Sequence, residues 1–177
     1  MTSTAFTVDI ARIRENARKE IERGAVTDGY EMNKDNVVTM LNAALATEII
    51  CVLRYKQHYY MCDGMNAQAV ANEFLEHAQQ EQDHADQLAE RITQLGGEPD
   101  MNPISMAKKS HSEYQPAGSV KEMIQENLIA ERIAIDSYRE MIHYLQDRDT
   151  TTRRMLEEIL AVEEEHADDL AGLLEKA

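Results

Sequence analysis

The stretch FLEHAQQEQDHADQLAERI, residues 74–92, repeats its apolar residues with the period of an α-helix. They form one stripe, made of Phe74, Ala78, Ala85, Leu88 and Ile92. Glu81 and His84 interrupt this stripe on its own face, where a polar side chain is costly to bury. The stretch therefore predicts an amphipathic helix that directs two polar groups at the core.

Similar stripes elsewhere in the chain predict an all-α fold. The four long helical segments are 34–62, 66–95, 119–146 and 151–175, and a shorter amphipathic one spans about 8–22. A helix of this length extends over about 42 Å and buries a one-sided stripe best against similar helices, in an antiparallel four-helix bundle. We therefore expect an N-terminal extension with a short helix at 1–33 and a helical bundle at 34–177.

The connections between the segments indicate the order of the helices. All three prolines lie within residues 97–118, which we interpret as one long loop. An extended chain covers about 3.3 Å per residue, so this loop can cross the whole length of the bundle. The other connections are short, and Ser119 with Glu122 predicts a capping box at the start of the third long helix. The sequence thus predicts two helical hairpins joined by a long crossover between the second and third long helices.

The composition excludes several classes of partner. The chain has 177 residues, with 33 Asp and Glu against 18 Lys and Arg, and a net charge of −15. A nucleic-acid surface needs a basic patch, whereas this acidity is compatible with cations. No stretch approaches the roughly 20 apolar residues of a transmembrane helix, and the N-terminus has no signal-peptide pattern. With only Cys51 and Cys62, too far apart on one helix for a disulfide, we expect a cytoplasmic protein without nucleic-acid or membrane partners.

Six polar residues interrupt the apolar stripes near the middle of the four long helices. They are four glutamates and two histidines: Glu48, Glu81, His84, Glu131, Glu163 and His166. A buried carboxylate without a partner costs several kcal/mol, so such a set needs mutual partners or a cation. A bound metal explains all six at once, whereas the alternative is a buried polar network with no metal.

The spacing of these residues forms a degenerate repeat. Glu81 with His84 is a Glu-x-x-His pair, and the same pair recurs as Glu163 with His166. In the same way, Glu48 followed by Tyr55 recurs as Glu131 followed by Tyr138. The offset from Glu48 to Glu131 and the offset from Glu81 to Glu163 differ by a single position. The two hairpins therefore carry the same pattern, which predicts a pseudo-twofold axis through the bundle. One Glu from each of two helices and a Glu-x-x-His from each of the other two is a known di-iron or di-manganese carboxylate arrangement.

With these motifs, over about 34–176, the chain resembles the ferritin-like superfamily and is most similar to its bacterioferritin and ferritin branch. The motifs are Glu48 with Tyr55, EQDHAD at 81–86, NLIAERIAIDSY at 127–138 and EEEHAD at 163–168. The resemblance implies that Glu81 and Glu163 bridge two irons, with Glu48 and His84 completing one iron and Glu131 and His166 the other. It implies two Fe per subunit, or Mn, because oxygen-rich ligation suits both metals.

The same resemblance implies a ferroxidase that oxidises Fe²⁺ with O₂ or H₂O₂ for iron storage and detoxification, in a homo-oligomer that is a dimer or a cage. Tyr55 and Tyr138 would hydrogen-bond the carboxylates or donate electrons. Gln82 stands where bacterioferritins carry a haem-ligating Met, so we expect no haem. Gln80 and Val162 replace the Asp that often supports the opposite histidine, which leaves the support of the two histidines open.

Two alternatives to a storage ferroxidase stay open. One is a non-storage di-metal enzyme, either a rubrerythrin-like peroxidase or a relative of manganese catalase. The other is a DNA-protecting miniferritin of the Dps type, against which the net charge of −15 argues.

Other reactive residues have ordinary interpretations. His77 could be a mobile accessory iron ligand, but we favour a partly buried or interface histidine. We expect His58, His111 and His143 to be solvated, and Cys51 to be a small core residue.

Overall fold

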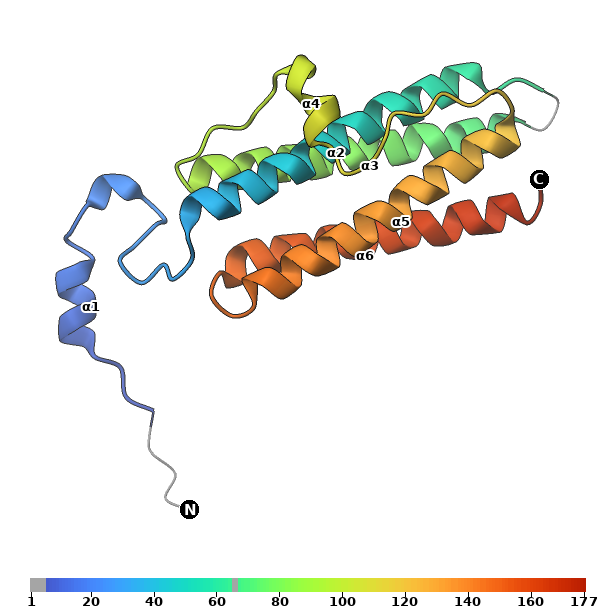
Figure 1. The fold of residues 1–177 in the computed structure, drawn as a ribbon. Coiled ribbons are helices and arrows are strands. Elements are labelled where there is room, and N and C mark those ends of the chain that lie inside the picture. Colours follow the sequence, from blue (N-terminus) through green and yellow to red (C-terminus); the bar gives the residue numbers. More distant parts are fainter. Residues whose placement is uncertain (1–5, 65–66) are drawn as a thin grey trace.

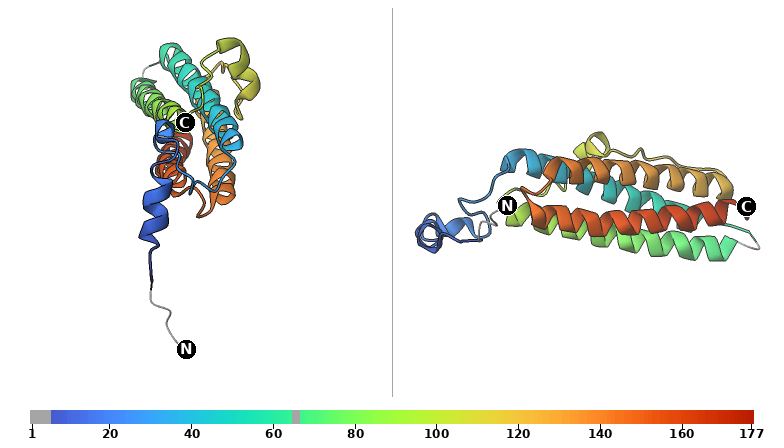
Figure 2. Two further views of the ribbon diagram at one scale, coloured as in Figure 1. Left: turned by 90° about the vertical axis from the view of Figure 1, so that its left-hand side faces the viewer. Right: turned by 90° about the horizontal axis from the view of Figure 1, so that it is seen from below.

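A computed structural model describes residues 6–64 and 67–177 as helices joined by loops, with no strand in these ranges (Figure 1). Its four long helices are α2 (Lys34–Met61), α3 (Ala67–Gln94), α5 (Val120–Leu145) and α6 (Thr150–Leu174). α2 pairs with α3 and α5 with α6, and the two hairpins lie side by side (Figures 1 and 2). The predicted all-α fold, an antiparallel four-helix bundle, is confirmed. Residue 66, the predicted start of the second long helix, lies outside the described residues.

Polar caps begin α2, α5 and α6 where the sequence changes from loop to periodic pattern. The Asn33 side chain accepts a hydrogen bond from the Asn36 amide at 3.0 Å, and Asp149 accepts one from the Thr152 amide at 3.0 Å. Ser119 and Glu122 form the predicted capping box, in which each side chain accepts a bond from the other's backbone N–H. These bonds satisfy amides that have no partner within the first turn of a helix.

The crossover between α3 and α5 contains a short helix, α4 (Pro103–Lys109), that packs against α2. The prediction of one structureless loop over 97–118 is wrong in this part. Asn102 caps the helix by accepting a bond from the Ile104 amide at 3.0 Å, and Pro103 occupies the first helical turn. Proline is well suited to that position because its missing N–H would have no helical partner.

The N-terminal region is only partly helical. The predicted helix at 8–22 is shorter than expected: α1 (Ile10–Asn16) is followed, after a break, by a 3₁₀ turn at Ile21–Arg23. α1 buries no residue and projects from one end of the bundle (Figure 1). Closer to α2, the Tyr30 hydroxyl donates to Asp149 at 2.8 Å and Met32 is buried, so this part of the predicted extension packs on the bundle. Residues 1–5 of that extension lie outside the described residues.

Two apolar clusters fill the bundle, one towards each end. The first contains Leu41, Leu45, Leu88, Ile92 and Leu156, and the second contains Tyr55, Phe74, Met123, Ile124 and Leu170. Along every long helix the six predicted ligands fall between the residues of the first cluster and those of the second. The polar centre is therefore enclosed at mid-bundle by apolar packing on both sides.

Within the described residues, α2 has the length and composition to cross a membrane, with a window of mean hydropathy 1.7. This differs from the expectation that no stretch approaches that composition. In the structure, 61% of this window is buried in the protein. Its apolar character is therefore explained by its place in the core of the bundle.

Candidate metal centre

All six predicted ligands converge in the middle of the bundle, and none of them is more than 4% exposed. Each comes from a helix that presents it on its inward face: Glu48 from α2, Glu81 and His84 from α3, Glu131 from α5, and Glu163 and His166 from α6. The i, i+3 spacing of the two Glu-x-x-His pairs places carboxylate and imidazole on one helix face.

The six side chains form two overlapping groups. In each group the candidate ligand atoms all lie within 4.8 Å of one another. One group is Glu48, Glu81, His84 and Glu163, and the other is Glu81, Glu131, Glu163 and His166. Glu81 and Glu163 belong to both groups, as expected of carboxylates that bridge two metals.

The two shared carboxylates direct one oxygen to each histidine. Nδ1 of His84 lies 2.9 Å from Oε1 of Glu163 and 3.7 Å from Oε2 of Glu81. Nδ1 of His166 lies 3.7 Å from the other oxygen of Glu163 and 3.8 Å from the other oxygen of Glu81. Glu48 lies 3.5 Å from Nδ1 of His84, and Glu131 lies 3.9 Å from Nδ1 of His166. Each group is thus a set of three carboxylates and one imidazole.

Most of the ligand atoms have no hydrogen bond of acceptable geometry, although some of them, such as Nδ1 of His84 and Oε1 of Glu163, are in ion-pair contact. Of the eight buried side-chain N and O atoms without a hydrogen bond in the described part of the chain, seven belong to these six residues and the eighth is Nε2 of His58. Folded proteins normally satisfy buried polar atoms, so each such group requires an explanation. Cations coordinated by carboxylate oxygens and imidazole nitrogens would satisfy all seven.

Crowding of the carboxylates changes their protonation. Burial, together with repulsion from neighbouring carboxylates, raises the pKa of Glu81, of Glu131 and of Glu163. Burial disfavours the charged form of His84, but the carboxylates of Glu163 and Glu48 outweigh it and raise its pKa to about 10. In the absence of a cation, protons therefore neutralise the cluster, and a metal would displace them.

The two tyrosines of the repeat contact the glutamates across the hairpins. The Tyr55 hydroxyl donates to Oε1 of Glu131, and the Tyr138 hydroxyl donates to Oε1 of Glu48. Each tyrosine comes from the opposite hairpin to its acceptor, which follows the pseudo-twofold pattern of the sequence. Burial, followed by the nearby carboxylates, raises the pKa of both phenols well above the ordinary value, so both are protonated at neutral pH.

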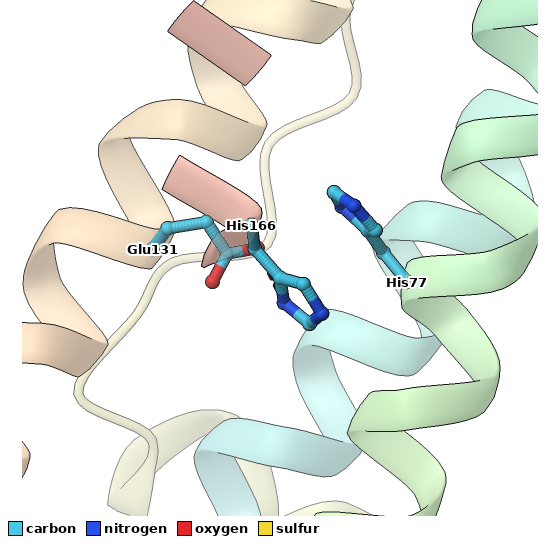
Figure 3. A group of neighbouring side chains, drawn as sticks. All are labelled: His77, Glu131 and His166. Carbon is cyan, nitrogen blue, oxygen red and sulfur yellow. Dashed lines mark ion pairs between the residues drawn. The ribbon is translucent and has the colours of Figure 1, made fainter. Parts of the chain in front are cut away.

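Only one of the two histidines is supported by the residue before a motif glutamate. Nε2 of His166 lies 2.8 Å from Oε1 of Gln80 and so donates its proton to it, which leaves Nδ1 free to face the glutamates. His77 also lies against this histidine, with the two rings stacked at 4.0 Å between centroids (Figure 3). His77 is 2% exposed, and burial, followed by the charge of His166, lowers its pKa to about 3.

A buried polar network beside the centre was not anticipated. Arg54 is 1% exposed and donates to the side chains of Asn127 at 2.9 Å and Ser112 at 3.0 Å, and to the carbonyl of Glu113 at 3.0 Å. The prediction that His58 is solvated is wrong, because it is fully buried with Nδ1 3.0 Å from the Asn127 amide nitrogen. The crossover covers this side of α2, which the local sequence pattern cannot reveal.

The interpretation of His77 as a partly buried or interface histidine is wrong, because the residue is fully buried. The interpretations of three other residues agree with the structure. His111 and His143 are exposed, as expected. Cys51 is a buried residue of the second apolar cluster. The sequence contained one signal for the unanticipated residues, since His77, Gln80, Glu81 and His84 form a polar stripe at i, i+3, i+4 and i+7.

A comparison with family models and a comparison with solved structures both find ferritin-like proteins. A family model described as a ferritin-like domain matches residues 38–177. The structure of a dodecameric, bacterioferritin-related thioferritin from Bacteroides fragilis superimposes with a TM-score of 0.80 at 31% identity, covering 82% of this chain and 88% of that one.

Two relatives by sequence carry different names. A nutrient stress-induced DNA-binding protein from Nostoc is 30% identical, over 77% of this chain and 76% of that protein. A bacterioferritin from Desulfovibrio desulfuricans is 27% identical, over 77% of this chain and 73% of that protein.

Proposed function

The chain belongs to the ferritin-like domain family, and from this premise we propose that it is a ferroxidase of the ferritin type. In this proposal Glu81 and Glu163 bridge two iron ions. Glu48 and His84 complete the coordination of one, and Glu131 and His166 that of the other. The observation that carries the proposal is the set of seven buried ligand atoms without hydrogen-bond partners, divided between two overlapping groups.

The substrates are Fe²⁺ and either O₂ or H₂O₂. Each of two Fe²⁺ ions gives up one electron. The two electrons and two protons convert O₂ to H₂O₂, or H₂O₂ to two water molecules, and two Fe³⁺ remain. A neighbouring pair of sites suits this reaction because both electrons are delivered at one place. Manganese fits the same oxygen-rich ligand set, and metal analysis of the purified protein distinguishes the two metals.

The chain's own residues prepare the site for this reaction. Tyr55 and Tyr138 hold one oxygen of Glu131 and of Glu48, which fixes these carboxylates before iron arrives. We further propose that the phenols, which contact the ligands directly, are local electron donors when O₂ is reduced fully to two water molecules: the two Fe²⁺ supply two electrons, and each phenol supplies one electron and one proton and becomes a tyrosyl radical, with two further protons taken from solvent. Gln80 fixes the His166 ring, so its lone pair faces the iron position.

We also propose that the product is stored, in a homo-oligomeric cage. The dodecameric state of the Bacteroides fragilis relative supports an assembly of this kind. Native mass spectrometry tests it, because each chain contributes 20.1 kDa and a twelve-chain cage therefore has six times the mass of a dimer. A native mass that corresponds to two chains would instead favour a non-storage enzyme.

Oxidation of Fe²⁺ by a double variant tests the assignment. Glu81→Gln with Glu163→Gln removes the charge of both bridging carboxylates without changing their size, so we expect rapid Fe²⁺ oxidation to be abolished. The measurement is the ferric absorbance after anaerobic loading and exposure to O₂. Glu76→Gln with Glu165→Gln, on the exposed faces of the same helices, is the matched control. Equal rates in the two double variants would refute the site.

A further inference from the structure

A second cluster of metal-ligating side chains lies on the outer side of His77. Nε2 of His77 is 3.4 Å from a carboxylate oxygen of Glu73 and 4.0 Å from one of Asp169. The histidine side chain is 2% exposed, whereas the two acidic side chains are 33% and 49% exposed. The ligand atoms of all three lie within 4.8 Å of one another, so the cluster joins solvent to a buried imidazole.

The contacts on the inner side fix the orientation of the His77 ring. Nδ1 of His77 lies 3.2 Å from the Tyr55 hydroxyl, which also contacts Glu131. This nitrogen is therefore turned towards the six-residue centre, and Nε2 is turned outward.

Nε2 is aimed at the carboxylates of Glu73 and Asp169. Stacking on His166, at 4.0 Å and 19°, and the bond to Tyr55 both hold the imidazole ring in this orientation. An imidazole of a 2% exposed side chain, held in place with its outer nitrogen towards two carboxylates, is a geometry that can bind a divalent cation.

We propose that Glu73, His77 and Asp169 form a further divalent-cation site, which adjoins the six-residue centre because the candidate ligand atoms of His77 also lie within 4.8 Å of those of Glu131 and His166. One imidazole nitrogen and two carboxylate oxygens suit Fe²⁺, Mn²⁺ or Zn²⁺, because the nitrogen ligand favours transition metals over Mg²⁺ or Ca²⁺. The half-exposed acids allow a hydrated cation to bind from solvent. The site lies one imidazole ring away from His166, so it is a loading position for the six-residue centre.

The sequence repeat restricts this site to one side of the bundle. At the offset that relates Glu81 to Glu163, the counterparts of Glu73 and His77 are Met155 and Ile159, which offer no oxygen or nitrogen ligand from their side chains. The counterpart of Asp169 on α3 at the same offset is the uncharged Gln87. The cation site therefore serves the position of His166 and Glu131, and the repeat builds no counterpart beside His84.

Zinc binding tests the proposal independently of Fe²⁺ oxidation. Metal-free full-length protein is titrated with Zn²⁺ by calorimetry, and the number of ions bound per chain is counted by elemental analysis. We expect Glu73→Gln with Asp169→Asn to bind one Zn²⁺ fewer than wild type. Removal of both charged ligands should weaken this site by more than the roughly 10–100-fold that loss of an outer hydrogen-bond partner costs a metal site.

The matched control is Glu76→Gln with Asp168→Asn, which removes the same charges from exposed positions on the same helices. We expect the control to bind as many ions as wild type. Equal stoichiometry in the two double variants would overturn the proposal. The Glu81→Gln and Glu163→Gln variant separates the sites: if only the six-residue centre has been misassigned, that variant loses no Zn²⁺ while the Glu73 and Asp169 variant still loses one.

Discussion

The α2–α3 and α5–α6 hairpins carry the same ligand pattern, but their surroundings differ. Each hairpin supplies two glutamates, one histidine and one tyrosine at matched positions. Four polar residues of the first hairpin have apolar or small counterparts in the second: Arg54, His58, His77 and Gln80 correspond to Ser137, Met141, Ile159 and Val162. The polar members support the position of His166 and the crossover, whereas the apolar residues Ile159 and Val162 stand at the positions that match His77 and Gln80.

This difference shows that the ligand residues and the residues around them are subject to different structural requirements. Two equivalent cations need matching ligand sets, so the repeat preserves the ligands. Outer residues control orientation, access and proton balance, and these need not be equal on the two sides. We therefore expect the two metal positions to differ in affinity and in ease of loading.

The pair Arg54 and Ser137 is the largest difference between the two hairpins, so replacement of Arg54 should have the largest effect on stability. Arg54→Met keeps an unbranched stem but leaves Asn127, Ser112 and the Glu113 carbonyl without their donor. Because hydrogen bonds from a charged donor contribute about 1.5–3 kcal/mol each and three are lost, we expect the free energy of unfolding to fall by at least about 4 kcal/mol. Urea denaturation of the metal-free protein measures it. Arg132→Met, at an exposed position of α5, is the control, and a similar change in both variants would contradict the argument.

The substitution Gln80→Val introduces into the first hairpin the valine that the second hairpin has at the matching position, Val162. His166 then loses the acceptor of its Nε2 proton, and its ring orientation and tautomer are no longer fixed. We expect one of the two metals to bind about 10–100-fold more weakly, with the other unchanged. A metal-binding titration resolves the two steps, with Gln79→Val as the exposed control. Two unchanged steps would show that the hairpins are equivalent in this respect.

His58→Met should have the smallest effect, visible in the dependence of stability on pH. Burial, followed by the charge of Arg54, lowers the pKa of His58 to about 4, whereas an unfolded histidine titrates near pH 6.5. Below about pH 6.5 the unfolded chain binds a proton that the folded chain does not. As the pH is lowered from about 6.5 to about 4, the free energy of unfolding therefore decreases. The contribution of this residue to the decrease is at most about 1.4 kcal/mol per pH unit.

The His58→Met variant carries the residue type of its counterpart, Met141. Its free energy of unfolding should decrease less steeply than that of wild type when the pH is lowered from 7 to 5. Thermal unfolding at several pH values measures this slope. An identical dependence of stability on pH in wild type and variant would show that His58 does not contribute to the loss of stability in acid.

Much of the centre was predictable because its signal is local. Glu48, Glu81, Glu131 and Glu163 interrupt apolar stripes, and helical periodicity alone directs them into the core. The structure brings them together with His84 and His166, as the spacing predicted. Their role in binding iron stays a prediction until it is measured.

Residues whose partners are distant in sequence escaped prediction. Gln80 and His166 are 86 residues apart, and nothing in either helix alone indicates their bond. His58 was expected in solvent because its own helix does not show that the crossover and α5 enclose it. The helix α4 was missed because its signals, Asn102 and Pro103, lie among residues that equally favour loops.

The sequence by itself determined the four helices, their pairing into two hairpins and the six residues that face the core, because helical periodicity and motif spacing are properties of the chain alone. The tertiary structure decided which oxygen faces which histidine, and that Gln80 and His77 support only one side. It also decided that an imidazole meets two carboxylates at the surface of α3 and α6. These features depend on distances between helices, and only packing of the side chains between them sets those distances.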